Sequence, residues 1–451
     1  MIDVLPERDL YLSEFEQFEK AAAAKSPAWL NRLRKGAISR FSELGFPGAR
    51  NEDWKFTSVA NIAKTPFKRA DGFAFSKANG REAESVQPAS LRDLLFEMPG
   101  LRQLVFVNGQ FAPGLSTRGT QQHGVIVADL AWVLASHPEW AEPHLGRHAT
   151  YKEQAFAALN TAFVQDGAFI QVKKNQAADG PIHLVFLSTS DGEPTVSHPR
   201  NLVIAEANSK VTLVETYASL GDDVYLTNAV TEIVVGENAV VDHCKLQREN
   251  SRAYHVGSLN VYHDRASNFT STYVGFGGAL VRNEVRVVFA AEGSESTLNG
   301  LYMASGQQHM DNHTVIDHAK AHCASHELYK GVLDGKAHGV FNGKIFVRQD
   351  AQKTDAKQTN KTLLLSDEAT INTKPQLEIF ADDVKCTHGA TVGQLDDESI
   401  FYLRSRGIGL DEARNLLTFA FANDVIGRIP VAPVRTQLED YLLKARHLPQ
   451  E

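Results

Sequence analysis

The 451-residue sequence has few cysteines and no long hydrophobic run. Its three cysteines, Cys244, Cys323 and Cys386, are an odd number spread far apart, which argues against a disulfide framework and for a reducing compartment. No apolar run is long enough to cross a bilayer. The N-terminus is acidic and polar, without the basic start and apolar core of a signal peptide. These absences predict a cytoplasmic chain with no membrane partner.

Charge and missing motifs exclude further classes of function. The chain has 46 Lys and Arg against 54 Asp and Glu, a net charge of −8, and no basic tail, so we expect no nucleic-acid partner. It has no G-x-x-x-x-G-K-[ST] loop, and Gly275, Gly277 and Gly278 lie among strand-like residues. No G-x-S-x-G elbow occurs either. We therefore predict no catalytic residues and no enzymatic activity, so any use of ATP requires another subunit.

Residues 1–165 are predicted to be mostly helical. Ser26 and Pro27 fit the N-cap and the first position of a helix whose apolar residues follow at helical spacing. Gly45 is a natural stop for that helix. A short strand-like run at residues 101–111 interrupts this helical region.

Residues 166–395 have the pattern of β-strands. Val, Ile, Thr, Tyr and Phe alternate with polar residues over short stretches such as 211–217 and 285–289, which is the period-2 pattern of a strand. Pro375 is the only proline between residues 201 and 400, so nearly every backbone N–H there is available for a sheet.

Acidic residues recur at the expected corners between these stretches. They are spaced by 14 to 17 residues in the second half of the region and by about double that interval upstream. A loose period with turn residues at its corners is typical of stacked β-coils, because one coil cannot bury its inner face alone. An antiparallel sandwich is the alternative, but Asn-Gly and Asp-Gly pairs are few, which favours the solenoid. The acidic corners are Glu206, Glu237, Asp264, Glu292, Asp317, Asp334, Asp350, Asp367, Asp382 and Asp396.

Residues 396–451 are predicted to be helical again. Asp396 can cap a helix that Gly407 ends, and a second helix begins near Leu410. Thr436 and Glu439 form a capping box that opens a final short helix. Such short amphipathic helices are unstable alone, so we expect them to dock on the solenoid or on a partner.

Histidines are concentrated in the second half of the chain. His318, His322 and His326 follow at i, i+4 and i+8 beside Cys323, which on a helix would place them on one face and suggest a metal site. The flanking residues are strand-like, which scatters these side chains and favours solvated histidines. A zinc-dependent binding module is the alternative, and the histidines from His309 to His338 receive no assigned role.

Cys386 and His388 form a separate candidate site. On a strand, positions i and i+2 point to the same face, and a thiolate with an imidazole suits iron, zinc or an iron–sulfur cluster. Two protein ligands are too few for a closed site. The other ligands would come from sulfide, a substrate or another chain.

Several stretches resemble the SufB/SufD family of iron–sulfur cluster assembly proteins. The likeness is densest from Tyr329 to Phe421, and Lys385-Cys-Thr-His-Gly-Ala-Thr-Val-Gly393 resembles the SufD branch of the family. The other similar stretches are Arg50-Asn-Glu-Asp-Trp-Lys-Phe-Thr57, Gly339-Val-Phe-Asn-Gly-Lys-Ile-Phe-Val347, Asn360-Lys-Thr-Leu-Leu-Leu-Ser-Asp367 and Phe401-Tyr-Leu-Arg-Ser-Arg-Gly-Ile408.

This resemblance implies a right-handed parallel β-helix flanked by N-terminal and C-terminal helical regions. It also implies a scaffold subunit of the SUF assembly complex, which pairs with SufB and binds the ATPase SufC. In the family the helical C-terminal region binds SufC, which maps to about Ile400 to Arg428 here. The candidate SufC-binding residues are Phe401, Tyr402, Leu403, Arg404, Arg406, Gly407, Leu417 and Phe421.

The resemblance also assigns a role to the Cys-x-His pair. Nascent clusters form near the SufB–SufD junction, where His388 and Cys386 would contribute, while sulfur delivery belongs to SufB. We therefore expect no stably bound cofactor, a transient cluster at the SufB interface, and a homodimer as one state of the isolated chain. The alternatives are a SufB-like paralogue and a carbohydrate-active β-helix enzyme such as a polysaccharide lyase.

Overall fold

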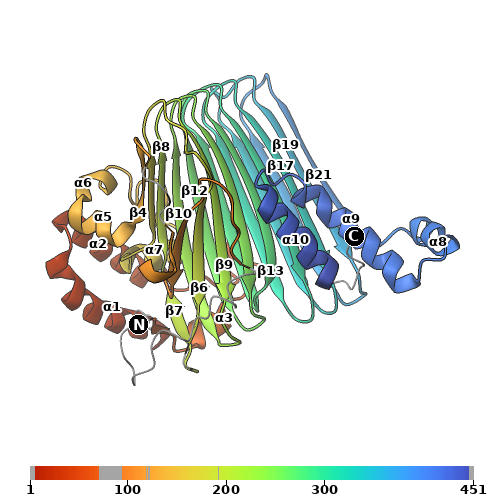
Figure 1. The fold of residues 1–451 in the computed structure, drawn as a ribbon, viewed down its shortest axis with the longest axis horizontal. Helices are drawn as coiled ribbons and strands as arrows, with labels where there is room; N and C mark the ends of the chain where they lie inside the picture. The colour runs from red at the N-terminus through yellow and green to blue at the C-terminus, as the bar shows by residue number, and fades with distance from the viewer. Residues whose placement is uncertain (1–5, 71–93, 118, 120–121, 191, 446–451) are drawn as a thin grey trace.

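The computed structural model describes residues 6–70, 94–117, 119, 122–190 and 192–445. Two long β-sheets form a solenoid, with helices at its N-terminal end and on the face of one sheet (Figure 1). The first sheet contains β4 (Val125–Asp129), β5 (Ala168–Val172), β8 (Arg200–Ala205), β10 (Tyr225–Val235), β12 (Tyr254–His263), β14 (Leu280–Phe289), β16 (His309–His318), β18 (His338–Val347) and β20 (Thr370–Ile379), with β1 (Lys68–Arg69) and β7 (Thr195–Ser197) alongside. The second contains β3 (Gln110–Phe111), β2 (Arg102–Val107), β6 (Ile182–Ser188), β9 (Lys210–Ser219), β11 (Val240–Glu249), β13 (Asn268–Gly277), β15 (Glu295–Ala304), β17 (Ala324–Leu333), β19 (Asp355–Leu364) and β21 (Lys385–Gly393).

Successive coils add one strand to each sheet, and the pairing is parallel from β5 to β21. Register partners along the first sheet include Leu226, Tyr254 and Leu280, so one coil is 26 to 28 residues there. From His338 to Thr370 it is 32 residues. The first lengths match the upstream spacing of the acidic corners, and the last is about twice the downstream spacing, which confirms the predicted β-solenoid.

Nearly all the predicted acidic corners lie in turns, and one does not. Asp317 is on strand β16, close to its end, where it bonds Arg348 across to the next coil. In the turns that contain Glu206 and Glu237 the backbone also adopts a left-handed conformation, which Asn tolerates best among residues with a side chain. Asn175, Asn208 and Asn238 occupy this position in successive coils, and their amides bond one another at 2.8 and 3.1 Å.

The solenoid interior is mainly apolar, with Phe, Leu, Ile and Val from both sheets in one continuous core. Pro375 lies on β20, which is the outermost strand of the first sheet. Proline removes a backbone donor, so an edge strand is where a sheet tolerates it. The single proline of this region therefore marks the end of the sheet.

The N-terminal region closes one end of the solenoid. Its helices are α1 (Pro6–Ala22), α2 (Ala28–Leu44), α3 (Ala60–Lys64), α5 (Leu130–Ser136), α6 (Pro138–Ala141) and α7 (Ala155–Ala162), with short 3-10 turns at Ala23–Lys25, Glu52–Trp54 and Pro113–Leu115. Gly45 ends α2 as predicted, with a φ of 63°. The N-cap was predicted one residue early: Pro27, not Ser26, precedes the first helical residue. The predicted strand-like run contains β2 and β3.

The C-terminal region contains α8 (Asp397–Ser405), α9 (Leu410–Ile426) and α10 (Ala432–Ala445). Asp396 caps α8 by accepting a hydrogen bond from Ser399 N at 2.9 Å, as predicted. The predicted capping box was wrong, because Thr436 and Glu439 lie inside α10. Pro433 sits in the first turn of that helix, where a missing N–H costs little.

Helices α9 and α10 cover the outer face of the second sheet, whereas α8 projects beyond it (Figure 1). Val425, Ile429, Val434 and Leu438 are buried against this sheet. Among the described residues, no helix is both long enough and apolar enough to cross a membrane.

Candidate functional site

The C-terminal end of the solenoid is bare. Strands β20 and β21 are the last strands of their sheets, and within the described chain neither has a neighbour on its outer side. Most of β21 is exposed, including Val392 at 45%. An exposed, unpaired strand offers a row of free backbone donors and acceptors to another chain. This end therefore has the chemistry of a pairing edge.

Cys386 and His388 lie on this edge and share a face, as the i, i+2 spacing predicts. In register, Cys386 is beside Ala356 and His388 is beside Gln358. Both partners are buried inside the solenoid, so Cys386 and His388 continue the interior face at its open end. The two side chains therefore lie where a second chain would close the solenoid.

Cys386 and His388 differ in how far their side chains are buried. Cys386 is partly buried and packs against the small apolar cluster of Ile345, Ala356 and Ala381. Burial raises the pKa of its thiol, so it is protonated at neutral pH unless a metal displaces the proton. His388 is exposed. The described residues contain no group of three His, Cys, Asp or Glu side chains that could hold a metal ion, so these two residues form an incomplete site.

Two residues behind His388 were missed in the sequence. Glu327, Gln358 and His388 occupy one row of successive coils. Gln358 donates from Nε2 to Glu327 Oε2 at 2.6 Å, while its buried Oε1 has no donor within the described residues. Burial raises the pKa of Glu327 to about 7. The signal was present in the numbering, because the three positions are 31 and 30 residues apart, one coil each.

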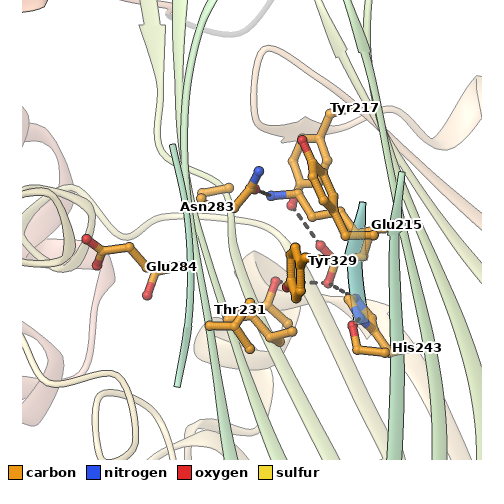
Figure 2. Close-up of a pocket in the computed structure, with 15 residues that line it drawn as sticks. Glu215, Tyr217, Thr231, His243, Asn283, Glu284 and Tyr329 are labelled. Atoms are coloured by element: carbon orange, nitrogen blue, oxygen red, sulfur yellow. Dashed lines mark hydrogen bonds and ion pairs between the residues drawn. The ribbon is translucent and has the colours of Figure 1, made fainter. Parts of the chain in front are cut away.

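A second polar cluster is sealed deep inside the solenoid (Figure 2). Glu215 accepts hydrogen bonds from Tyr217 and Thr231, each at 2.9 Å, and lies 3.5 Å from His243. The adjoining cavity of about 20 Å³ has room for about one water molecule. Its size excludes an organic ligand, so this cluster can hold the coils in register but cannot serve as a substrate site.

The sealed cluster adjoins a second group of buried polar and charged side chains. Lys245 Nζ lies 2.9 Å from His255 Nε2 and 2.7 Å from Asn283 Oδ1, and His255 Nδ1 lies 2.9 Å from Glu249. Burial lowers the pKa of Lys245 to about 8. These groups could not be singled out from the sequence, because alternation predicts only that they face inward.

His309 helps to hold the segment that resembles the family's N-terminal signature. Thr57 lies 2.8 Å from His309 Nε2 and also bonds Asp311. Arg282 bonds Asp311 and the carbonyl oxygen of Asp53. Residues 51–57 are thus fastened across the outer face of the first sheet.

His318, His322 and His326 are scattered, as the strand-like flanks predicted. His318 is buried and bonds Ser325 at 2.9 Å, so the expectation of a solvated histidine is wrong there. His322 occupies a left-handed corner with a φ of 59°. His326 lies on β17.

The candidate SufC-binding residues fall into two groups. Phe401 and Tyr402 on α8 are 74% and 57% exposed. Arg404, Arg406 and Gly407 are exposed as well, and Leu403 and Leu417 are partly buried beside them. Phe421 instead lies against the solenoid, where Lys330 Nζ is 4.4 Å from its ring centre and bonds its carbonyl oxygen. The hairpin tip is therefore the free surface, and Phe421 helps to anchor the hairpin.

Comparisons with known proteins agree with this architecture. Residues 186–421 match the SufBD core domain of SUF-system iron–sulfur cluster assembly, and residues 6–184 match the SufBD N-terminal region. An iron–sulfur cluster assembly SufBD family protein of Synechocystis is 34% identical over 90% of this chain and 88% of its own length. The assembly protein SufD of Escherichia coli is 31% identical over 90% of each chain, and SufD of Bacillus subtilis is 28% identical over 95% of this chain and 97% of its own. The chain belongs to the SufBD family of the SUF iron–sulfur cluster assembly system.

Proposed function

We propose that this chain is a non-enzymatic SufD-type scaffold subunit that pairs with a SufB-type chain through the open end of its solenoid. The observation that carries the proposal is the bare edge formed by β20 and β21, with Cys386 and His388 on its interior face. Pairing would continue both sheets into the partner and would bury exposed apolar residues such as Phe380 and Val392. A transient cluster at this junction would take ligands from both chains.

The cluster role rests on the openness of the site. Two protein ligands leave positions free for sulfide and for partner residues, and an incomplete site releases its cargo more readily than a closed four-ligand site. The test is cluster formation by the reconstituted complex carrying His388→Ala or Cys386→Ser. We expect His388→Ala to lower the cluster yield with complex assembly intact. A wild-type yield from the assembled variant would contradict the role of His388.

Partner pairing has its own test. Val392→Lys places a charge on the bare edge, so we expect SufB capture to fall by about tenfold or more. The isolated variant should keep its stability, because Val392 is 45% exposed. Unchanged capture would place the SufB contact elsewhere.

The hairpin of α8 and α9 is proposed as the SufC site. Its tip carries two exposed aromatic residues and two exposed arginines, the residue types enriched at interface hot spots. We expect this chain to lack ATPase activity and to change the ATPase rate of SufC. Phe401→Glu with Tyr402→Glu should abolish SufC capture without unfolding the chain. Trp132→Glu, at an exposed aromatic residue 46% accessible at the other end of the molecule, is the matched control. Capture by the doubly substituted hairpin would remove the assignment.

A further inference from the structure

A basic groove of about 420 Å³ lies on the outer face of the first sheet, far along the chain from Cys386 and His388. Strands β10, β12 and β14 form its floor, and the loop after α6 forms a wall. None of the described residues that line it is an Asp or a Glu. The polar residues that line the groove are His144, Arg147, His148, Asn260, Tyr262 and Arg286.

The two arginines of this groove have no partner within the described residues. Neither Arg147 nor Arg286 has a side-chain hydrogen bond, an ion pair or a cation–π contact there. Arg286 is partly buried, and its Nε is fully buried without an acceptor. A buried N–H donor without an acceptor is costly, so a fold rarely keeps one without use.

The carboxylates on and beside the strands of the floor are already engaged. Glu232 accepts hydrogen bonds from Arg200 and from three backbone N–H groups of residues 146–149. Glu284 bonds Arg282 and Gln154, and Figure 2 shows it pointing away from the interior cluster.

The carboxylates on the two flanks of the groove are also paired with basic side chains of this chain. Glu206 is paired with Lys173, and Asp317 holds Arg348 through two bonds of 2.9 and 2.7 Å. These four described carboxylates therefore do not neutralise the positive charge of the groove, although the chain as a whole carries a net charge of −8.

We infer that this groove binds a small organic anion through a phosphate or carboxylate group. Arginine matches the paired oxygens of both groups with two parallel N–H donors. The volume exceeds that of a bare oxyanion and suits a ligand with an organic body. The ring of Tyr262, whose centre is 4.8 Å from that of His148, and the apolar side chains of Val234 and Val288 offer a surface for that body.

The test is calorimetric titration of the full-length chain with phenyl phosphate, benzoate, inorganic phosphate and uncharged phenol. We expect an aromatic anion to bind, phenol not to bind, and inorganic phosphate to bind more weakly than phenyl phosphate. The stronger of phenyl phosphate and benzoate identifies the head group. Arg286→Gln and Arg147→Gln should each weaken binding by about tenfold.

Arg428→Gln is the matched control, because Arg428 follows α9 beside the second sheet, away from the groove, and its partly exposed guanidinium is paired with Asp424. It should bind the anion like the wild type. Arg286→Gln should not lower the melting temperature, since its guanidinium has no partner to lose, and anions should no longer raise it. Absence of binding by every anion at millimolar concentration, or equal binding by wild type and Arg286→Gln, would overturn the inference.

Discussion

The two ends of the solenoid are built from the same coils but finished in opposite ways. At the first end, α2, α5 and α7 cover the strands, and Glu232 on β10 is fully buried beneath the loop that follows α6. At the last end, β20 and β21 have no cover within the described residues, and Phe380 is 59% exposed. A parallel coil always leaves unpaired groups at both ends, and the bare end is the one at which we propose a partner chain.

The largest effect is expected at the closed end. Glu232→Ala would leave Arg200 buried without its anion, because Arg200 Nη2 lies 2.6 Å from Glu232 and both side chains are at most 1% exposed. Burial opposes ionisation of Glu232, but Arg200 and the surrounding N–H groups lower its pKa overall. We expect a loss of about 3–5 kcal/mol in the free energy of unfolding by denaturant titration.

An exposed pair provides the control for that measurement. Glu237 and Arg265 also link neighbouring coils, but their side chains are 38% and 68% exposed. Glu237→Ala should cost less than about 1 kcal/mol. Equal losses in the two variants would contradict the view that burial at the closed end makes the difference.

A smaller effect is expected from pH, acting through Glu327 near the open end. Burial raises its pKa from 4.5 to about 7 in the folded chain. The unfolded chain therefore releases this proton first, and the contribution of Glu327 to stability falls as pH rises from about 4.5 to 7 and stays low above. The loss is about 3 kcal/mol.

Glu327→Gln isolates this contribution. The variant cannot ionise and retains an oxygen that can accept from Gln358, so it should exceed the wild type in stability at pH 8 and match it near pH 4.5. Denaturant titrations at the two pH values give the comparison. A constant difference between wild type and variant across this range would show that Glu327 does not titrate there.

Replacing Gln358, which lies behind His388, should affect the candidate cluster site more than the stability of the fold. If His388 is a ligand, an acceptor for its second ring nitrogen would fix its tautomer, and the unpartnered Oε1 of Gln358 is next to it in register. Gln358→Leu should then lower cluster formation by the reconstituted complex by about tenfold. Asn360→Leu is the control, because its register partner is Ala390. Equal losses in both variants would indicate a general packing effect.

The smallest expected effect is a difference in alkylation rate between the cysteine at the open end and the two cysteines elsewhere in the solenoid. Cys386 at the open end is partly buried, whereas Cys244 and Cys323 are 1% exposed. Burial raises the pKa of all three thiols. We expect Cys386 alone to be alkylated in the native chain, slowly, and to be protected when a SufB-type partner is bound. Mass spectrometry of the modified peptides would detect this, and modification of Cys244 at the same rate would show that the interior is open.

Much of the architecture could be predicted because it depends on local patterns. Alternation predicted the strands, and the acidic period predicted the coil, apart from Asp317, whose strand ends just beyond it. The cap at Asp396 and the stop at Gly45 were correct for the same reason. Thr436 and Glu439 failed because docking of Val434 and Leu438 on the second sheet extends α10 past the local cap signal.

The sequence by itself determined the solenoid, its flanking helices and the shared face of Cys386 and His388, since each follows from the period of side chains along a strand or helix. Only the tertiary structure placed Gln358 and Glu327 behind His388, turned Phe421 inward, and brought Arg147 and Arg286 together without a carboxylate partner among the described residues. These contacts join residues one coil or more apart in the chain. Their geometry depends on the register and packing of whole coils, which no local pattern specifies.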